Sequence, residues 1–202
     1  MSYLEKILCK YLKYKFIFED NIKHSSYLYQ KVFRSIYGYH QNVTKKNNKV
    51  YIYFRKGVIS DIPYIRPGKN SIILPVGQEQ KLIDFFETGI NPTHKWKDKG
   101  NWKVNTEINN IEIDAKSITL SLEKYINNID IISNDNTIIN INTSLNSILK
   151  DNNINIKYTS YLLQKINEII NLEWFLKSKK YSVELSNFYN NYLLLKQKIN
   201  NI

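Results

Sequence analysis

The sequence predicts an α+β protein in which N-terminal helices and a small antiparallel sheet precede a mixed region that ends in an antiparallel helical hairpin. Three patterns within its 202 residues predict this class. Apolar residues recur at helical spacing in residues 3–38, alternate strictly in residues 50–55, and are spaced by three and four between Leu185 and Ile199.

Two amphipathic helices are expected at the N-terminus. The first covers residues 3–16, in which four apolar side chains share one helical face: Leu4, Ile7, Leu8 and Leu12. The second begins after Ser26 and also has an apolar stripe, made of Leu28, Val32 and Ile36. Gly38 predicts where it ends, because glycine commonly follows the last turn of a helix.

A small antiparallel sheet is expected next. In residues 50–55, valine, isoleucine and phenylalanine alternate strictly with tyrosine and arginine, which predicts a strand. The polar turn at residues 45–48 makes this strand half of a hairpin. Residues 71–74 are short and continuously apolar, as a buried strand is. Residues 78–87 predict a helix with three inward side chains: Leu82, Phe85 and Phe86.

The second half predicts further short elements and two longer helices. Isoleucines indicate a strand near residues 108–113, after which Asp114 caps a helix, and residues 129–132 and 138–141 resemble a hairpin. One C-terminal helix opens at Thr159. The other opens at Ser182 and carries the apolar seam of Leu185, Phe188, Tyr192, Leu195 and Ile199.

Positive charge is concentrated in the first half of the chain. The net charge is +11, with 18 Lys and Arg against 8 Asp and Glu in residues 1–100, but 11 against 10 in residues 101–202. We therefore predict a basic α+β nucleic-acid-binding unit (1–92), a basic loop with tryptophan (93–103) and a near-neutral region (104–202), with one continuous domain as the alternative. A basic stripe indicates a polyanionic partner, although a merely solvated basic surface has the same composition.

The strand at residues 50–55 supplies the strongest binding motif. Alternation places Tyr51, Tyr53 and Arg55 on one face, and Val50, Ile52 and Phe54 on the other, which is expected to pack on the core. Aromatic rings and guanidinium groups stack on unpaired bases, and nearby lysines suit phosphates. The alternative is that these tyrosines are ordinary strand residues.

Other basic residues extend this predicted surface. The loop from Lys95 to Lys103 interleaves lysine with tryptophan, and Arg66 and Lys69 lie in a segment stiffened by proline and glycine. The predicted nucleic-acid-binding residues are Lys45, Lys46, Lys49, Tyr51, Tyr53, Arg55, Lys56, Arg66, Lys69, Lys95, Trp96, Lys97 and Lys99.

These patterns predict a non-catalytic nucleic-acid-binding protein of low sequence specificity, with RNA slightly favoured over DNA. A protein-interaction or assembly module that acts, or self-associates, through the C-terminal helical hairpin is the first alternative. A metal-dependent nuclease using Asp61, Glu79 and Lys81 is the second.

No cofactor or metal is expected. The three histidines lie far apart with no ligand at metal-binding spacing, and the chain lacks a phosphate-binding glycine-rich loop. The single cysteine, Cys9, excludes an intramolecular disulfide. Charges interrupt the N-terminus, and no stretch reaches the roughly 18 apolar residues of a membrane span. A cytoplasmic protein with no membrane contact is therefore expected.

Overall fold

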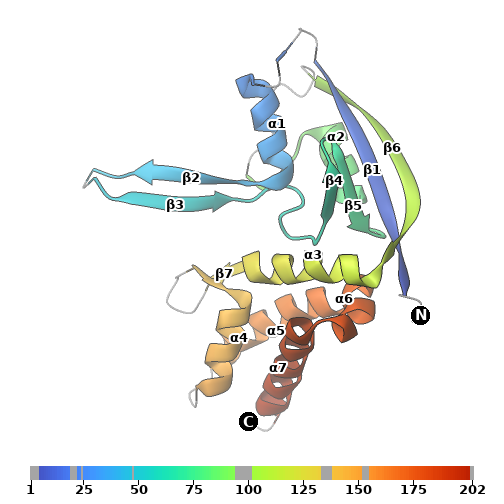
Figure 1. Ribbon diagram of the computed structural model, residues 1–202. Helices are drawn as coiled ribbons and strands as arrows, with labels where there is room; N and C mark the ends of the chain where they lie inside the picture. Colours follow the sequence, from blue (N-terminus) through green and yellow to red (C-terminus); the bar gives the residue numbers. More distant parts are fainter. Residues whose placement is uncertain are drawn as a thin grey trace. The chain divides into compact units, whose positions relative to one another are not determined.

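Two compact units are connected through two long strands. The structure is a computed structural model, and it describes residues 5–18, 22–23, 25–46, 48–93, 102–132, 138–151 and 155–200 (Figure 1). One unit is Lys10–Asn110, and the other combines Met1–Cys9 with Ile111–Ile202. The chain passes between them within β1 (Lys6–Phe18) and within β6 (Trp102–Asp114).

The first element is a strand, so the prediction of a helix at residues 3–16 is wrong. From Leu12 to Phe16 in β1, every second side chain is buried, and Lys13 and Lys15 between them are exposed. Leu8, which the helical stripe placed inward, is 44% exposed. Strand pairing on both sides of β1 overrides the local helical spacing, and strands therefore precede the helices.

β1 lies inside a four-stranded sheet of order β4-β5-β1-β6, where β4 is Ile65–Gly68 and β5 is Ser71–Pro75. β4 and β5 are antiparallel. Every residue of β5 is buried, which confirms the prediction of a buried strand from its continuous apolar run.

β1 and β6 are neighbours in this sheet, and contacts near both ends indicate that they run antiparallel. Just beyond one end of the pair, the backbone nitrogen of Ala115 donates a hydrogen bond to the carbonyl oxygen of Glu5 at 2.8 Å. At the other end, the rings of Phe16 and Trp102 pack edge to face, with 5.7 Å between their centroids. Residue numbers that rise in one strand and fall in the other mark opposite directions.

Two helices complete the core of the first unit. α1 (Tyr27–Tyr37) begins at Ser26, whose side chain accepts from Tyr29 N, and ends at Gly38, as predicted. α2 (Gln80–Thr88) buries the predicted Leu82, Phe85 and Phe86. Trp102 is 1% exposed and packs on Phe85, so its indole belongs to this core.

The predicted hairpin is present as a separate two-stranded ribbon. β2 (Tyr39–Thr44) pairs antiparallel with β3 (Val50–Arg55), and Tyr39 lies opposite Arg55 while Thr44 lies opposite Val50. Figure 1 shows this ribbon extending away from α1 and β4. Neither strand belongs to the four-stranded sheet.

The second unit is mainly helical. After β6, Asp114 caps α3 (Ala115–Asn128), and the predicted short hairpin is present as β7 (Asp130–Ile132) and β8 (Ile138–Asn140). The remaining elements are α4 (Ile141–Lys150), α5 (Ile156–Ile170), α6 (Glu173–Ser178), the 3₁₀ helix η2 (Lys179–Tyr181) and α7 (Val183–Asn200).

The C-terminal helices differ from the prediction in two respects. The first predicted helix begins at Ile156 rather than Thr159, and it is interrupted at Asn171 and Leu172 between α5 and α6. In α7 the seam residues Leu185, Phe188, Tyr192 and Leu195 are buried. Within the described ranges, no helix combines the length and apolar character that a membrane crossing requires.

Candidate nucleic-acid interface

The ribbon ends in a tight turn that carries lysines. Lys45 N donates to the carbonyl oxygen of Lys49 at 3.0 Å, and Asn48 N donates to that of Lys45 at 2.9 Å. Asn48 has a φ of 59°, a left-handed conformation that asparagine tolerates well. The turn therefore holds three exposed lysines at the free end of the ribbon: Lys45, Lys46 and Lys49.

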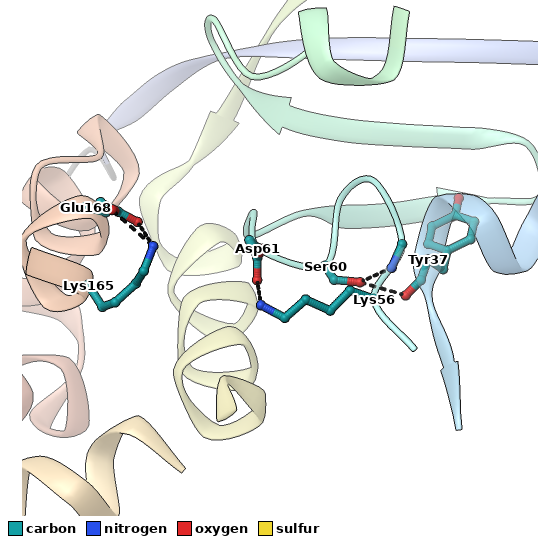
Figure 2. A network of polar contacts seen from close by, with 7 residues as sticks. Tyr37, Lys56, Ser60, Asp61, Lys165 and Glu168 are labelled. Carbon is teal, nitrogen blue, oxygen red and sulfur yellow. Dashed lines mark hydrogen bonds and ion pairs between the residues drawn. The ribbon is translucent and has the colours of Figure 1, made fainter. Parts of the chain in front are cut away.

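The other end of the ribbon is fixed to α1 by hydrogen bonds. Val58 N donates to the carbonyl oxygen of Ser35 at 2.8 Å, and Ile59 N to that of Ile36 at 3.1 Å. Figure 2 shows the hydroxyl of Ser60, which accepts from Gly57 N at 2.7 Å and donates to the carbonyl oxygen of Tyr37 at 3.4 Å. These contacts make the root of the ribbon a rigid base.

Strand pairing places tyrosines of both strands on one face of the ribbon. Residues directly opposite each other in an antiparallel pair share a face. Tyr51 and Tyr53 therefore lie beside their partners Val43 and Gln41, and Arg55 lies beside Tyr39. The predicted set of Tyr51, Tyr53 and Arg55 is thus brought together on one side.

Aromatic rings flanked by cations follow one another in what we call the cation–aromatic row: Lys45, Tyr51, Tyr53, Arg55, Tyr39 and Arg34. The Lys45 ammonium lies 4.5 Å from the ring centroid of Tyr51, and the Arg55 guanidinium 5.8 Å from that of Tyr53. The two tyrosine rings stack with their centroids 6.5 Å apart and their planes inclined by 23°. These distances lie within or near the range of favourable cation–π and stacking contacts.

The row continues from the ribbon onto α1. The Arg34 guanidinium lies 5.1 Å from the ring centroid of Tyr39, and Arg55 Nε donates to Gln41 Oε1 at 2.8 Å. Sequence reasoning missed the contributions of Tyr39 and Gln41 to this row. The alternation of Tyr39, Gln41 and Val43 was the available signal, but it is weak because it contains one aromatic residue.

The opposite face corrects a sequence-based expectation. Val50, Ile52 and Phe54 were expected to pack on the core, but they are 59%, 67% and 42% exposed. Alternation identifies which residues share a face but not whether that face is covered. On this face all three side chains remain exposed, and β2 and β3 pair with each other rather than with the four-stranded sheet.

The remaining predicted residues fall in different places. Lys56 Nζ forms an ion pair with Asp61 at 2.8 Å (Figure 2), and Lys69 is exposed in the turn between β4 and β5. Arg66 lies over the rings of Tyr37 and Phe33, at 4.7 and 5.7 Å from their centroids. Four predicted residues lie outside the described residues: Lys95, Trp96, Lys97 and Lys99.

The aromatic residues beneath Arg66 form a neutral layer in which Tyr14 is buried and Phe33, Tyr37 and Tyr64 are half-buried. The hydroxyls of Tyr14 and Tyr37 are 2.8 Å apart and share a hydrogen bond. Burial raises the pKa of both phenols and that of Tyr64, which keeps all three neutral at physiological pH. Arg66 is exposed, and the rings that it contacts are uncharged.

The residues predicted for the nuclease alternative make separate contacts. Asp61 pairs with Lys56, and Glu79 lies 3.8 Å from Lys10. Lys81 is exposed on α2. Within the described parts of the chain, no three His, Cys, Asp or Glu side chains are grouped to hold a metal ion. We therefore derive no hydrolytic chemistry from these residues.

The charge asymmetry coincides with the division into units. Residues 10–110 contain 18 basic and 8 acidic residues, a net charge of +10, whereas the other unit contains 11 and 10. The cation–aromatic row lies entirely within the basic unit. Long-range attraction of a polyanion and short-range stacking would therefore act on the same unit.

Comparison with protein-family models matches no family, and comparisons with curated proteins and with solved structures find no similar protein.

Proposed function

We propose that the chain is a non-catalytic nucleic-acid-binding protein that holds a single strand, preferentially RNA, against the β2–β3 ribbon. The observation that carries this proposal is the cation–aromatic row, in which cations flank aromatic rings along one face of a projecting ribbon and at its root. The +10 charge of the surrounding unit supports it.

Each part of the row has a role in this proposal. Bases of an unpaired strand stack on Tyr51 and Tyr53, because every base presents a π face to an aromatic ring. Lys45, Lys46 and Lys49 at the free end of the ribbon contact phosphates, which releases counterions from the strand. Stacking on the rings leaves the strand backbone free to approach the flanking cations.

Low sequence specificity follows from the same arrangement. Stacking accepts any base, and lysine is a point charge with no preference among base edges. The Arg55 side chain is already oriented by its hydrogen bond to Gln41 and its contact with Tyr53. A guanidinium held in this way serves stacking and phosphate contact better than the bidentate recognition of guanine.

The test is binding of fluorescently labelled single-stranded RNA and DNA, measured by fluorescence anisotropy on the full chain. Tyr53→Ala should weaken binding by roughly 1–3 kcal/mol, the loss of one base–aromatic stack. Ile52→Ala is the matched control, because Ile52 neighbours Tyr53 but lies on the opposite face and is 67% exposed. Equal affinities of the two variants would overturn the proposal.

The salt dependence of the association constant is a second test of the same proposal. If several lysines meet phosphates, the logarithm of the association constant should fall linearly with the logarithm of salt concentration, with a slope of several units. Lys45→Gln and Lys49→Gln together should reduce that slope, whereas Lys81→Gln, on exposed α2 surface, should leave it unchanged. A slope near zero for the unmodified protein would contradict phosphate contact.

A further inference from the structure

A small hollow lies where the cation–aromatic row reaches α1. Its volume is about 240 Å³, and it is lined by Tyr27, Lys31, Arg34, Ser35, Tyr39 and Thr93. Arg34 and Tyr39 belong both to the hollow and to the row. A strand that follows the row from the free end of the ribbon to its root therefore reaches this hollow.

The lining is suited to an anion. Lys31 and Arg34 are three residues apart on α1, so their side chains emerge on the same face of the helix. None of the six lining residues is acidic, and the phenol hydroxyls of Tyr27 and Tyr39 can donate hydrogen bonds to oxygen. The hydroxyls of Ser35 and Thr93 already donate to the carbonyl oxygen of Lys31 at 3.0 Å and to Asn91 Oδ1 at 2.8 Å. Among the described residues, Arg34 forms no ion pair with a carboxylate.

The volume of the hollow further restricts the ligands that it can hold. Sites for drug-sized ligands enclose about 300–1,000 Å³, so a hollow of about 240 Å³ is small for a whole nucleotide with its base. A phosphate group with part of its sugar is a better match. A terminal phosphate monoester carries roughly −1.5 to −2 charges near neutral pH, against one for an internal phosphodiester, which favours it beside two cations.

We propose that this hollow binds the terminal phosphate monoester of a single strand whose adjoining bases stack along the cation–aromatic row. This inference rests on the proposed function and adds recognition of a strand end. A 5′-phosphate and a 3′-phosphate share this chemistry, and the polarity of the strand along the ribbon decides which of them reaches Lys31 and Arg34.

The experiment compares single-stranded oligonucleotides with an internal fluorophore and one of three end structures: a 5′-phosphate, a 3′-phosphate, or hydroxyls at both ends. Anisotropy titrations of the full chain should show one phosphorylated form binding about tenfold more tightly than the hydroxyl form, the effect of a charge-assisted contact. Lys31→Gln should bring the ratio of these two dissociation constants close to one. Lys81→Gln, which removes an equal charge elsewhere on the same unit, should preserve the ratio.

The outcomes separate the two proposals. If the oligonucleotides bind and Tyr53→Ala weakens them, but the end structure has no effect, the terminal-phosphate site is wrong and the proposed function stands. Both phosphorylated forms could instead bind more tightly than the hydroxyl form by the same factor, with a preference that Lys31→Gln does not alter. In that case the extra charge acts through the overall positive field of the protein, and the terminal-phosphate site is again wrong. If no oligonucleotide binds, the proposed function fails. Thermal melting followed by circular dichroism is the control that tests whether the Lys31→Gln variant is folded.

Discussion

Gly57 lies directly against the backbone of Gly38, since a Cβ atom added at Gly57 would clash with the Gly38 nitrogen. It would also clash with the carbonyl oxygen of Ile36. Gly38 itself has a φ of +77°, a conformation that side chains other than glycine rarely adopt. The end of α1 and the segment after β3 thus approach each other at backbone distance, which is what anchors the ribbon.

Gly57→Ala should therefore destabilise the protein. The added methyl group meets backbone atoms that cannot rotate away, and overpacking of this kind costs about 1–3 kcal/mol. Chemical denaturation measures the change. Gly68→Ala is the control, because its added Cβ would meet only the Ser71 side chain, at 3.3 Å. Equal denaturation midpoints for the two variants would show that the root of the ribbon yields easily.

Ile52→Ala should leave stability nearly unchanged, contrary to the expectation from alternation alone. Ile52 is 67% exposed, so truncating it removes little buried surface, and exposed substitutions usually change stability by less than about 0.5 kcal/mol. Ile72→Ala, in buried β5, should cost about 2–5 kcal/mol. A large loss for Ile52→Ala would mean that its face is covered in solution.

Leu195→Asp should unfold or strongly destabilise the second unit. Leu195 is fully buried in the seam of α7, and an unpaired carboxylate there costs more than the roughly 2–5 kcal/mol of truncation to alanine. Leu194→Asp is a neighbouring control, because Leu194 is 53% exposed. Thermal melting of both variants tests this, and similar melting temperatures would contradict the packing of α7.

Asp114→Ala should lower the free energy of unfolding by about 1 kcal/mol at neutral pH, as for other N-cap losses. Asp114 Oδ1 accepts from Ser117 N at 2.8 Å, and Oδ2 accepts from the Ser117 hydroxyl at 2.7 Å. These hydrogen bonds lower the pKa of Asp114 below its ordinary 3.8.

The stabilisation by Asp114 should depend on pH in one direction. Because the folded state lowers its pKa, the contribution of the carboxylate is complete well above pH 3.8 and is lost as the pH falls through the lowered value. Denaturation at pH 7 and near pH 3 measures the gap between the protein and Asp114→Ala, which should narrow in acid. A gap that widens in acid would contradict this sign.

Local sequence patterns were sufficient where an element is stabilised by its own residues or by a near neighbour. α1 follows from its apolar stripe, the Ser26 cap and Gly38, and β3 from its alternation beside a polar turn. β5 follows from its continuous apolar run. The placement of Tyr51, Tyr53 and Arg55 on one face follows from the period of a strand, which is two whatever surrounds it.

Tertiary contacts decided the rest. The N-terminal stripe fits a helix, but Glu5 pairs with Ala115 at the start of α3 and Phe16 packs on Trp102 in β6, contacts with distant residues that no local pattern encodes. Ile52 belongs to a ribbon that forms a sheet of its own and is 67% exposed, which alternation alone does not predict. The row gains Tyr39 and Arg34 only because strand pairing and the turn at Gly38 carry them to Arg55. Periodicity determines which side chains share a face, whereas distant partners determine what that face meets.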